Sequence, residues 1–183
     1  MAKDPRRAAM TVWHVAGNSG LGKTLLLQAL VTQLPGTIRV LKHSHHPLEP
    51  DTEGSDTDRL NHAATTARIH DNGIVLRGKQ PGFLEFVTWY GSHCDHLLLE
   101  GLKFLDTPKI YLNQEESDPR ITTGTVIGPR RPVSSEVLWI AAELPLTRNT
   151  ASDIAAVLVK ETIRTGFTWE ALIQALKSFR FPD

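Results

Sequence analysis

Residues 12–33 read VWHVAGNSGLGKTLLLQALVTQ, and this stretch decides the fold of the chain. Within it, residues 17–24 match the phosphate-binding loop GxxxxGK(S/T) in full. The run at 11–16 is apolar enough for a buried strand, and leucines recur at helical spacing directly after the loop. A loop between a strand and a helix can point its backbone N–H groups, backed by the helix dipole, at phosphate oxygens. The stretch therefore predicts binding of a nucleoside triphosphate.

The residue types of this loop suit phosphate chemistry. Its three glycines permit dihedrals closed to other residues and let the main chain approach an anion closely. Lys23 would reach the β and γ phosphates, and the Thr24 hydroxyl would ligate Mg²⁺. The alternative is a glycine-rich turn that only caps a helix. The predicted nucleotide-binding residues here are Gly17, Asn18, Ser19, Gly20, Leu21, Gly22, Lys23, Thr24 and Leu25.

Composition excludes several classes of protein. At 183 residues the chain has the length of one domain with a sizeable core. Lys plus Arg equal Asp plus Glu at 20 each, so no net charge favours nucleic acid or an anionic membrane as a partner. A lone cysteine, Cys94, indicates a reducing compartment, and no apolar run matches a membrane span or a signal peptide. We expect a cytoplasmic protein with a mobile leader at 1–10 and one domain at 11–183.

Patterns along the rest of the chain alternate between strand and helix. Strands are expected at 37–41, 73–77, 95–101, 109–112 and 136–142. Helices are expected from about 58 to 67 and at 81–90, 153–163 and 168–179. This order predicts an α/β fold, a doubly wound and mostly parallel sheet of the phosphate-loop NTPase type with some antiparallel additions. Residues 113–135 lack such a pattern, and we interpret them as a flap, a hairpin or an inserted contact surface.

Acidic residues that could complete a Mg²⁺ site follow two predicted strands. Glu100 ends the run His-Leu-Leu-Leu-Glu, and an acid at the end of a buried strand must be hydrogen-bonded or bound to a cation. Asp51 lies in the polar stretch after the second strand and is our candidate for an acid that approaches the metal when nucleotide binds. It could instead be a turn former. The predicted metal ligands are Thr24, Asp51 and Glu100, and Arg59 is the nearest candidate for a catalytic arginine.

Four separated motifs resemble one known family. They are Lys42-His43-Ser44-His45-His46; Asp51, Gly54, Asp56 and Arg59; Glu100-Gly101-Leu102-Lys103; and Pro108-Lys109-Ile110. In this order they resemble the molybdopterin-guanine dinucleotide biosynthesis protein B family, MobB, from about residue 11 to about 112. The chain departs from the family pattern at Ser55, at 63–67 and at 113–114.

That resemblance implies a GTP-binding, weakly hydrolysing protein that uses Mg²⁺. It would work as a homodimer beside the enzyme that transfers GMP onto molybdopterin, and it could contact molybdopterin itself. Lys42, His43 and Lys103 then become candidates for contact with nucleotide or pterin phosphate, as does Lys109, although such lysines can also be solvated surface charges. Because no arginine finger or general base stands out near the loop, we expect slow turnover with Lys23, Asp51, Glu100 and Arg59 as the catalytic candidates.

Three other functions stay open at this point. A small-molecule kinase would use 113–135 as a lid that carries Arg120, Arg130 and Arg131. A metal-insertion GTPase would bind zinc or nickel through His43, His45 and His46. Finally, a pure binding adapter would show no meaningful turnover.

Overall fold

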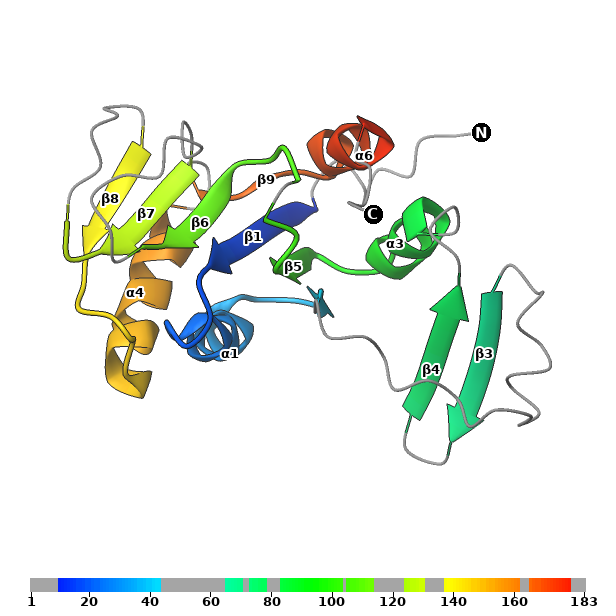
Figure 1. The fold of residues 1–183 in the computed structure, drawn as a ribbon, viewed down its shortest axis with the longest axis horizontal. Helices are drawn as coiled ribbons and strands as arrows, with labels where there is room; N and C mark the ends of the chain where they lie inside the picture. The colour runs from blue at the N-terminus through cyan, green and yellow to red at the C-terminus, as the bar shows by residue number, and fades with distance from the viewer. Residues whose placement is uncertain are drawn as a thin grey trace.

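The computed structural model describes residues 10–43, 65–70, 73–78, 83–103, 105–113, 124–130, 137–161 and 165–178. Within these residues the main sheet has seven strands in the order β2-β5-β1-β6-β7-β8, with β9 paired to β1 (Figure 1). The strands are β1 Thr11–Gly17, β2 Ile38–Lys42, β5 His96–Glu100, β6 Lys109–Leu112, β7 Gly124–Gly128, β8 Val137–Ala141 and β9 Phe167–Thr168. All of them run parallel except β9, so the predicted α/β sheet is confirmed.

Strand β1 lies at the centre of the sheet, between β5 and β6. The strand β2 that follows it in the chain pairs with β5 instead, so β5 separates the two strands of the first β-α-β unit. In this register Val15 lies opposite Glu100, and Glu100 lies opposite Lys42. The carboxyl ends of β1, β5 and β2 therefore meet at one edge of the sheet, the edge where ligands bind in open α/β folds.

Within the described residues, two helices cover each face of the sheet. α1 (Lys23–Gln33) and α4 (Arg148–Lys160) pack on one face, and α3 (Phe83–Gly91) and α6 (Trp169–Ser178) pack on the other (Figure 1). In β5, Leu98 faces the α1 and α4 side whereas Leu97 and Leu99 face the other side, which explains an uninterrupted leucine run in a strand covered on both faces. No helix in the described part of the chain is long and apolar enough to cross a membrane.

Local sequence accounts for the helix ends near the site. α1 stops because Pro35 disfavours helical dihedrals at Leu34, which is extended with a ψ of 137°. α4 begins after Thr147, whose hydroxyl accepts a hydrogen bond from the Thr150 N–H at 3.2 Å. The end of α1 thus agrees with the proline that follows it, and the start of α4 with a threonine cap. The helix α4 starts five residues before the predicted residue 153.

A separate two-stranded antiparallel sheet corrects one prediction. The helix expected through about residue 67 is wrong at its end, because β3 (Thr65–His70) pairs with β4 (Gly73–Gly78) from Thr65 onward. Only Asp71 and Asn72 separate the two strands, and together with Gly73 they form Asp-Asn-Gly, a composition typical of hairpin loops. The helix cap proposed near residue 58 lies outside the described residues. Figure 1 shows the hairpin apart from the main sheet.

Two predicted boundaries also change. Residues 124–128 were assigned to a flap or insertion, but they form β7, which is paired on both sides and buried from Thr125 to Gly128. The lid required by the kinase hypothesis therefore loses its central part, while 114–123 and 131–136 lie outside the described residues. Met10, the last residue of the predicted leader, is only 5% exposed and packs in the core cluster under α3 and α6.

Candidate nucleotide-binding site

The loop between β1 and α1 is exposed in its first half and anchored to the rest of the fold in its second half. Asn18, Ser19 and Gly20 are exposed, whereas Leu21 is buried and its carbonyl accepts a hydrogen bond from the Leu146 N–H at 3.1 Å. Gly22 caps α1 with a φ of 95°, and a Cβ at this position would lie 2.8 Å from the Leu146 Cβ. Both observations require glycine here.

The first turn of α1 leaves its positive end available. Its cap makes no side-chain hydrogen bond, and none of its first residues is acidic. The unpaired N–H groups and the dipole of a helix start favour an anion, and here no carboxylate of the helix itself satisfies them. The loop thus has the local electrostatics that the sequence motif predicts.

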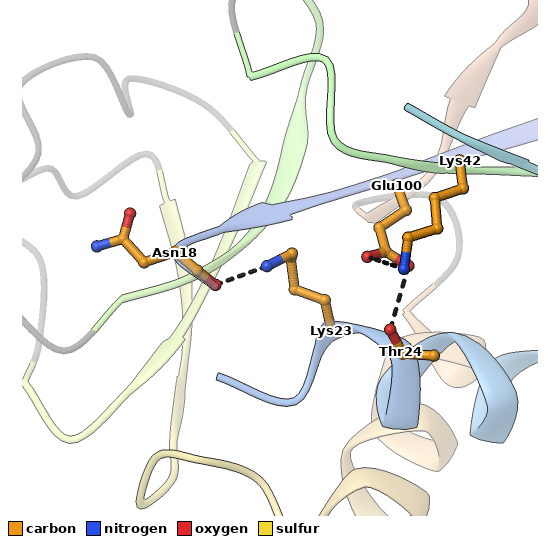
Figure 2. A network of polar contacts seen from close by, with 5 residues as sticks. All are labelled: Asn18, Lys23, Thr24, Lys42 and Glu100. Atoms are coloured by element: carbon orange, nitrogen blue, oxygen red, sulfur yellow. Dashed lines mark hydrogen bonds and ion pairs between the residues drawn. The ribbon is translucent and has the colours of Figure 1, made fainter. Parts of the chain in front are cut away.

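The side chain of Lys23 contacts the main chain of this loop. Its Nζ donates a hydrogen bond to the Asn18 main-chain carbonyl at 2.6 Å (Figure 2). Burial lowers the pKa of Lys23 below its usual value; Glu100 opposes this shift, whereas Lys103 and Lys42 act in the same direction as burial. The ammonium groups of Lys42 and Lys103 therefore repel that of Lys23, and a bound polyanion would relieve this repulsion.

Glu100 is the only carboxylate that the described residues bring to this cluster of lysines. It ends β5, is 6% exposed, and its two oxygens have different partners. Oε2 accepts a hydrogen bond from the Thr24 hydroxyl at 3.4 Å, and Oε1 forms an ion pair with Lys42 Nζ at 3.1 Å. A carboxylate this deeply buried requires such partners, as expected for an acid at the end of a buried strand.

These donors fit Mg²⁺. A hydroxyl and a carboxylate are the hard oxygen ligands that this cation prefers, and Thr24 and Glu100 already approach each other. The Glu100 carboxylate also forms the ion pair with the Lys42 ammonium (Figure 2), so Lys42 and a bound Mg²⁺ would compete for it. Asp51, the third predicted ligand, and Arg59 lie outside the described residues.

Other predicted residues divide into two groups. Lys103 reaches the loop, with its Nζ 3.4 Å from Asn18 Oδ1, and the His43 N–H donates to the Glu100 carbonyl at 2.8 Å. Lys109 Nζ, in contrast, donates to the main-chain carbonyls of Leu105 and Thr107. A phosphate contact of Lys109 stays a prediction.

The histidine metal site receives no support from the described part of the chain. His45 and His46 lie outside it, and within it no group of three or more His, Cys, Asp or Glu side chains could hold a metal ion. Arg120 and Arg131 of the kinase lid also lie outside the described residues.

Two residues that contribute to the site, Leu146 and His14, are not among the predicted site residues. Leu146 supports the loop through its main chain, which no side-chain motif can indicate. His14 is fully buried in β1 behind the site and contacts Gly101 and Thr107. Its signal in the sequence is a histidine inside an otherwise apolar strand, because a buried imidazole must find hydrogen-bond partners.

The sequence of this chain matches one family of known proteins. A family model described as molybdopterin guanine dinucleotide synthesis protein B, MobB, matches residues 12–126. The chain belongs to the MobB family. The match covers the phosphate loop, Lys42, Glu100 and Lys103, and it ends inside β7. The resemblance inferred from four motifs is thereby confirmed.

Relatives of known name agree with the MobB assignment. The chain is 30% identical over 141 residues to the molybdopterin-guanine dinucleotide biosynthesis adapter protein of Haemophilus influenzae, covering 72% of this chain and 74% of the relative. It is also 30% identical over 116 residues to a putative adapter protein of that name from Methanocaldococcus jannaschii, covering 58% of this chain and 49% of the relative.

Solved MobB structures share the fold. A crystal structure of molybdopterin-guanine biosynthesis protein B matches with a TM-score of 0.55 at 15% identity, covering 83% of this chain and 99% of that one. A structure of Bacillus subtilis MobB matches with a TM-score of 0.53 at 18% identity, covering 82% and 96%. At these identities the likeness concerns the arrangement of strands and helices only.

Proposed function

We propose that this MobB-family chain binds GTP with Mg²⁺ and assists the enzyme that transfers GMP onto molybdopterin. The observation that carries the proposal is the convergence of Lys23, Thr24 and Glu100 on an open phosphate loop at the start of α1. Membership of the MobB family supplies the pathway, and the adapter name of the relatives supports an accessory role.

The proposed chemistry divides the work among these groups. The loop amides and Lys23 bind the β and γ phosphates, and the Thr24 hydroxyl with the Glu100 carboxylate holds Mg²⁺. When bound, the cation neutralises charge on the phosphate oxygens. In the described part of the chain the charges that act on Lys23 are Glu100, Lys42 and Lys103, none of which is an arginine. We therefore expect slow hydrolysis, with Arg59 as the remaining candidate for a catalytic arginine.

Other parts of the proposal depend on the sequence: the dimer and the pterin on the family resemblance, and the compartment, the domain and Asp51 on the residues themselves. We infer a homodimer that works in the cytoplasm, with residues 11–183 forming one domain and Asp51 approaching the metal. Molybdopterin is a further expected contact of the complex. Sedimentation of the purified chain tests the dimer directly, because a single monomeric species over the micromolar range would contradict it.

A reconstituted reaction tests the function. The GMP-transferring enzyme, molybdopterin, GTP and Mg²⁺ are combined with and without this chain, and formation of the dinucleotide is followed. We expect a faster reaction with the unmodified chain and no gain with Lys23→Ala, since that variant lacks the phosphate contact. Equal rates in all three mixtures would contradict the accessory role. Transfer of phosphate to a small acceptor would instead favour the kinase hypothesis.

Lys42 gives a second test of the metal site. Lys42→Met keeps a long unbranched side chain but removes the ammonium that pairs with Glu100. The ammonium of Lys42 competes with Mg²⁺ for the Glu100 carboxylate. We therefore expect the Lys42→Met variant with bound nucleotide to bind Mg²⁺ at about a threefold lower concentration than the unmodified chain. Titration of Mg²⁺ into the chain saturated with a fluorescent GTP analogue measures this. Lys160→Met, an exposed change on α4, is the control, and a Mg²⁺ requirement equal to or above that of the unmodified chain would exclude the competition.

A further inference from the structure

The buried histidine of β1 uses both of its ring nitrogens. His14 is 0% exposed; its Nε2 lies 2.6 Å from the Gly101 carbonyl and its Nδ1 lies 2.7 Å from the Thr107 hydroxyl. A carbonyl only accepts, so Nε2 carries the hydrogen and donates. It follows that Nδ1 accepts from the Thr107 hydroxyl. A single neutral tautomer satisfies both contacts.

Both partners of His14 belong to one connection. We call residues 101–109, which follow β5 and include the first residue of β6, the 101–109 loop; residue 104 lies outside the described residues. Inside it the Leu105 N–H donates to the Leu102 carbonyl at 2.9 Å, and the Thr107 N–H donates to the Leu105 carbonyl at 3.0 Å. Lys109 Nζ adds hydrogen bonds to the carbonyls of Leu105 at 2.5 Å and Thr107 at 3.2 Å. His14 joins the two ends of this loop.

The first turn of the 101–109 loop has an unfavourable backbone. Gly101 has a φ of 92° and Leu102 a φ of 47°, and left-handed dihedrals cost free energy in a residue that carries a Cβ. A Cβ at Gly101 would also lie 2.8 Å from the His43 carbonyl. Such a turn persists only when its surroundings hold it, and here the burial of Leu102 and the bond from His14 to Gly101 do so.

The consequence of this turn is the position of Lys103. After the left-handed turn at Gly101 and Leu102, Lys103 Nζ lies 3.4 Å from Asn18 Oδ1 on the phosphate loop. The charge of Lys103 also acts on Lys23. A lysine at this place is near enough to the loop to contact the phosphates of a bound nucleotide.

We propose that His14 is a positioning residue of the nucleotide site, which clamps Gly101 and Thr107 so that Lys103 contacts the phosphates of bound GTP. This inference rests on the proposed GTP binding. Nothing in the phosphate-loop motif requires a histidine three residues before its first glycine, so the role belongs to this chain's own packing.

The protonation state of His14 agrees with the proposal. Burial lowers the pKa of its imidazole to about 4; the hydrogen bond to Gly101 opposes this shift, and the charge of Lys109 adds to it. At neutral pH the ring is therefore uncharged, as the acceptor role of Nδ1 requires.

A double-mutant cycle tests the positioning role. GTP affinity is measured by calorimetry for the unmodified chain, Lys103→Met, His14→Phe and the double variant, all in the presence of Mg²⁺. We expect each single change to weaken binding roughly tenfold, since each removes one charged phosphate contact or its placement. In the Lys103→Met background we expect His14→Phe to add less than about twofold. A Lys103→Met variant of unchanged affinity, or additive effects of the two changes, would overturn the inference.

Thr107 supplies a milder second variant. Thr107→Val removes the hydroxyl that donates to Nδ1, and Thr107→Ser restores it. The valine variant should weaken GTP binding and the serine variant should recover it, provided that Lys103 is present. If Thr107→Val lost thermal stability but kept its GTP affinity, His14 would stabilise the fold without positioning Lys103, and the inference would be wrong. If the unmodified chain bound no GTP, the proposed function itself would fail, whereas additivity in a chain that binds GTP would remove only this inference.

Discussion

Replacement of Lys23 by alanine is expected to weaken binding of a nucleoside triphosphate roughly a hundredfold. The Lys23 ammonium is already placed over the loop by its 2.6 Å hydrogen bond to the Asn18 carbonyl, so little ordering is needed when phosphate arrives. Burial lowers the pKa of this group, which means that its charge is poorly solvated in the free protein. A phosphate oxygen would supply an anionic partner for the ammonium, and alanine has no charged group to make that contact.

Calorimetry with GTP and Mg²⁺ measures the effect of Lys23→Ala. Lys160→Ala is the matched control, because Lys160 is exposed in the last turn of α4, about 18 Å along that helix from its start beside the loop. We expect the control to change affinity by less than about twofold. Thermal unfolding of each variant establishes that the fold is intact. Equal affinities for Lys23→Ala and the unmodified chain would exclude residues 17–24 as the phosphate site.

Acid is expected to destabilise the folded chain through His14. Its pKa is 6.5 in an unperturbed imidazole and about 4 in the folded protein, with burial as the main cause. Between these values the unfolded chain binds a proton that the folded chain does not, so stability is complete above pH 6.5 and falls as the pH is lowered to about 4. The shift corresponds to roughly 3 kcal/mol of unfolding free energy over that window.

Urea unfolding at pH 7 and pH 4.5 measures this dependence. The same pair of curves for His14→Gln, which cannot take up the proton, should show a much smaller loss between the two pH values. Burial also lowers the pKa of His96, but His96 is present in both proteins, so the difference between them isolates His14. Parallel losses of stability in the two proteins would show that the buried imidazole is not the titrating group.

Much of the fold could be predicted because its signals are local. The leucine run of β5, the apolar run of β1 and the proline after α1 each depend on a few adjacent residues, and the structure confirms all three elements. The errors occurred where distant partners decide. Residues 124–128 contain only a short β-branched run, Thr125 to Ile127, and their pairing with β6 and β8 on both sides makes them a core strand. Thr65 to Ala67 form a strand and not the end of a helix because they pair with β4.

The candidate site divides in the same way. Lys23, Thr24 and Glu100 were predicted, since a contiguous motif and the end of a buried strand identify them. The ion pair of Lys42 with Glu100 and the approach of Lys103 to Asn18 could not be, because they depend on the register of β2 with β5 and on the turn at Gly101. His14 was overlooked for the same reason, as both of its partners are more than eighty residues away in the chain.

By itself, the sequence determined that a phosphate loop joins a central strand to a helix, because glycines, a lysine and a threonine at fixed spacing specify that geometry locally. Only the tertiary structure decided which charges surround the loop. Strand order places β5 between β1 and β2, and this brings Glu100 to Thr24 and Lys42 to Glu100. The physical reason is that hydrogen-bonded pairing between distant strands, and the packing of His14 against the 101–109 loop, are absent from any short stretch of chain.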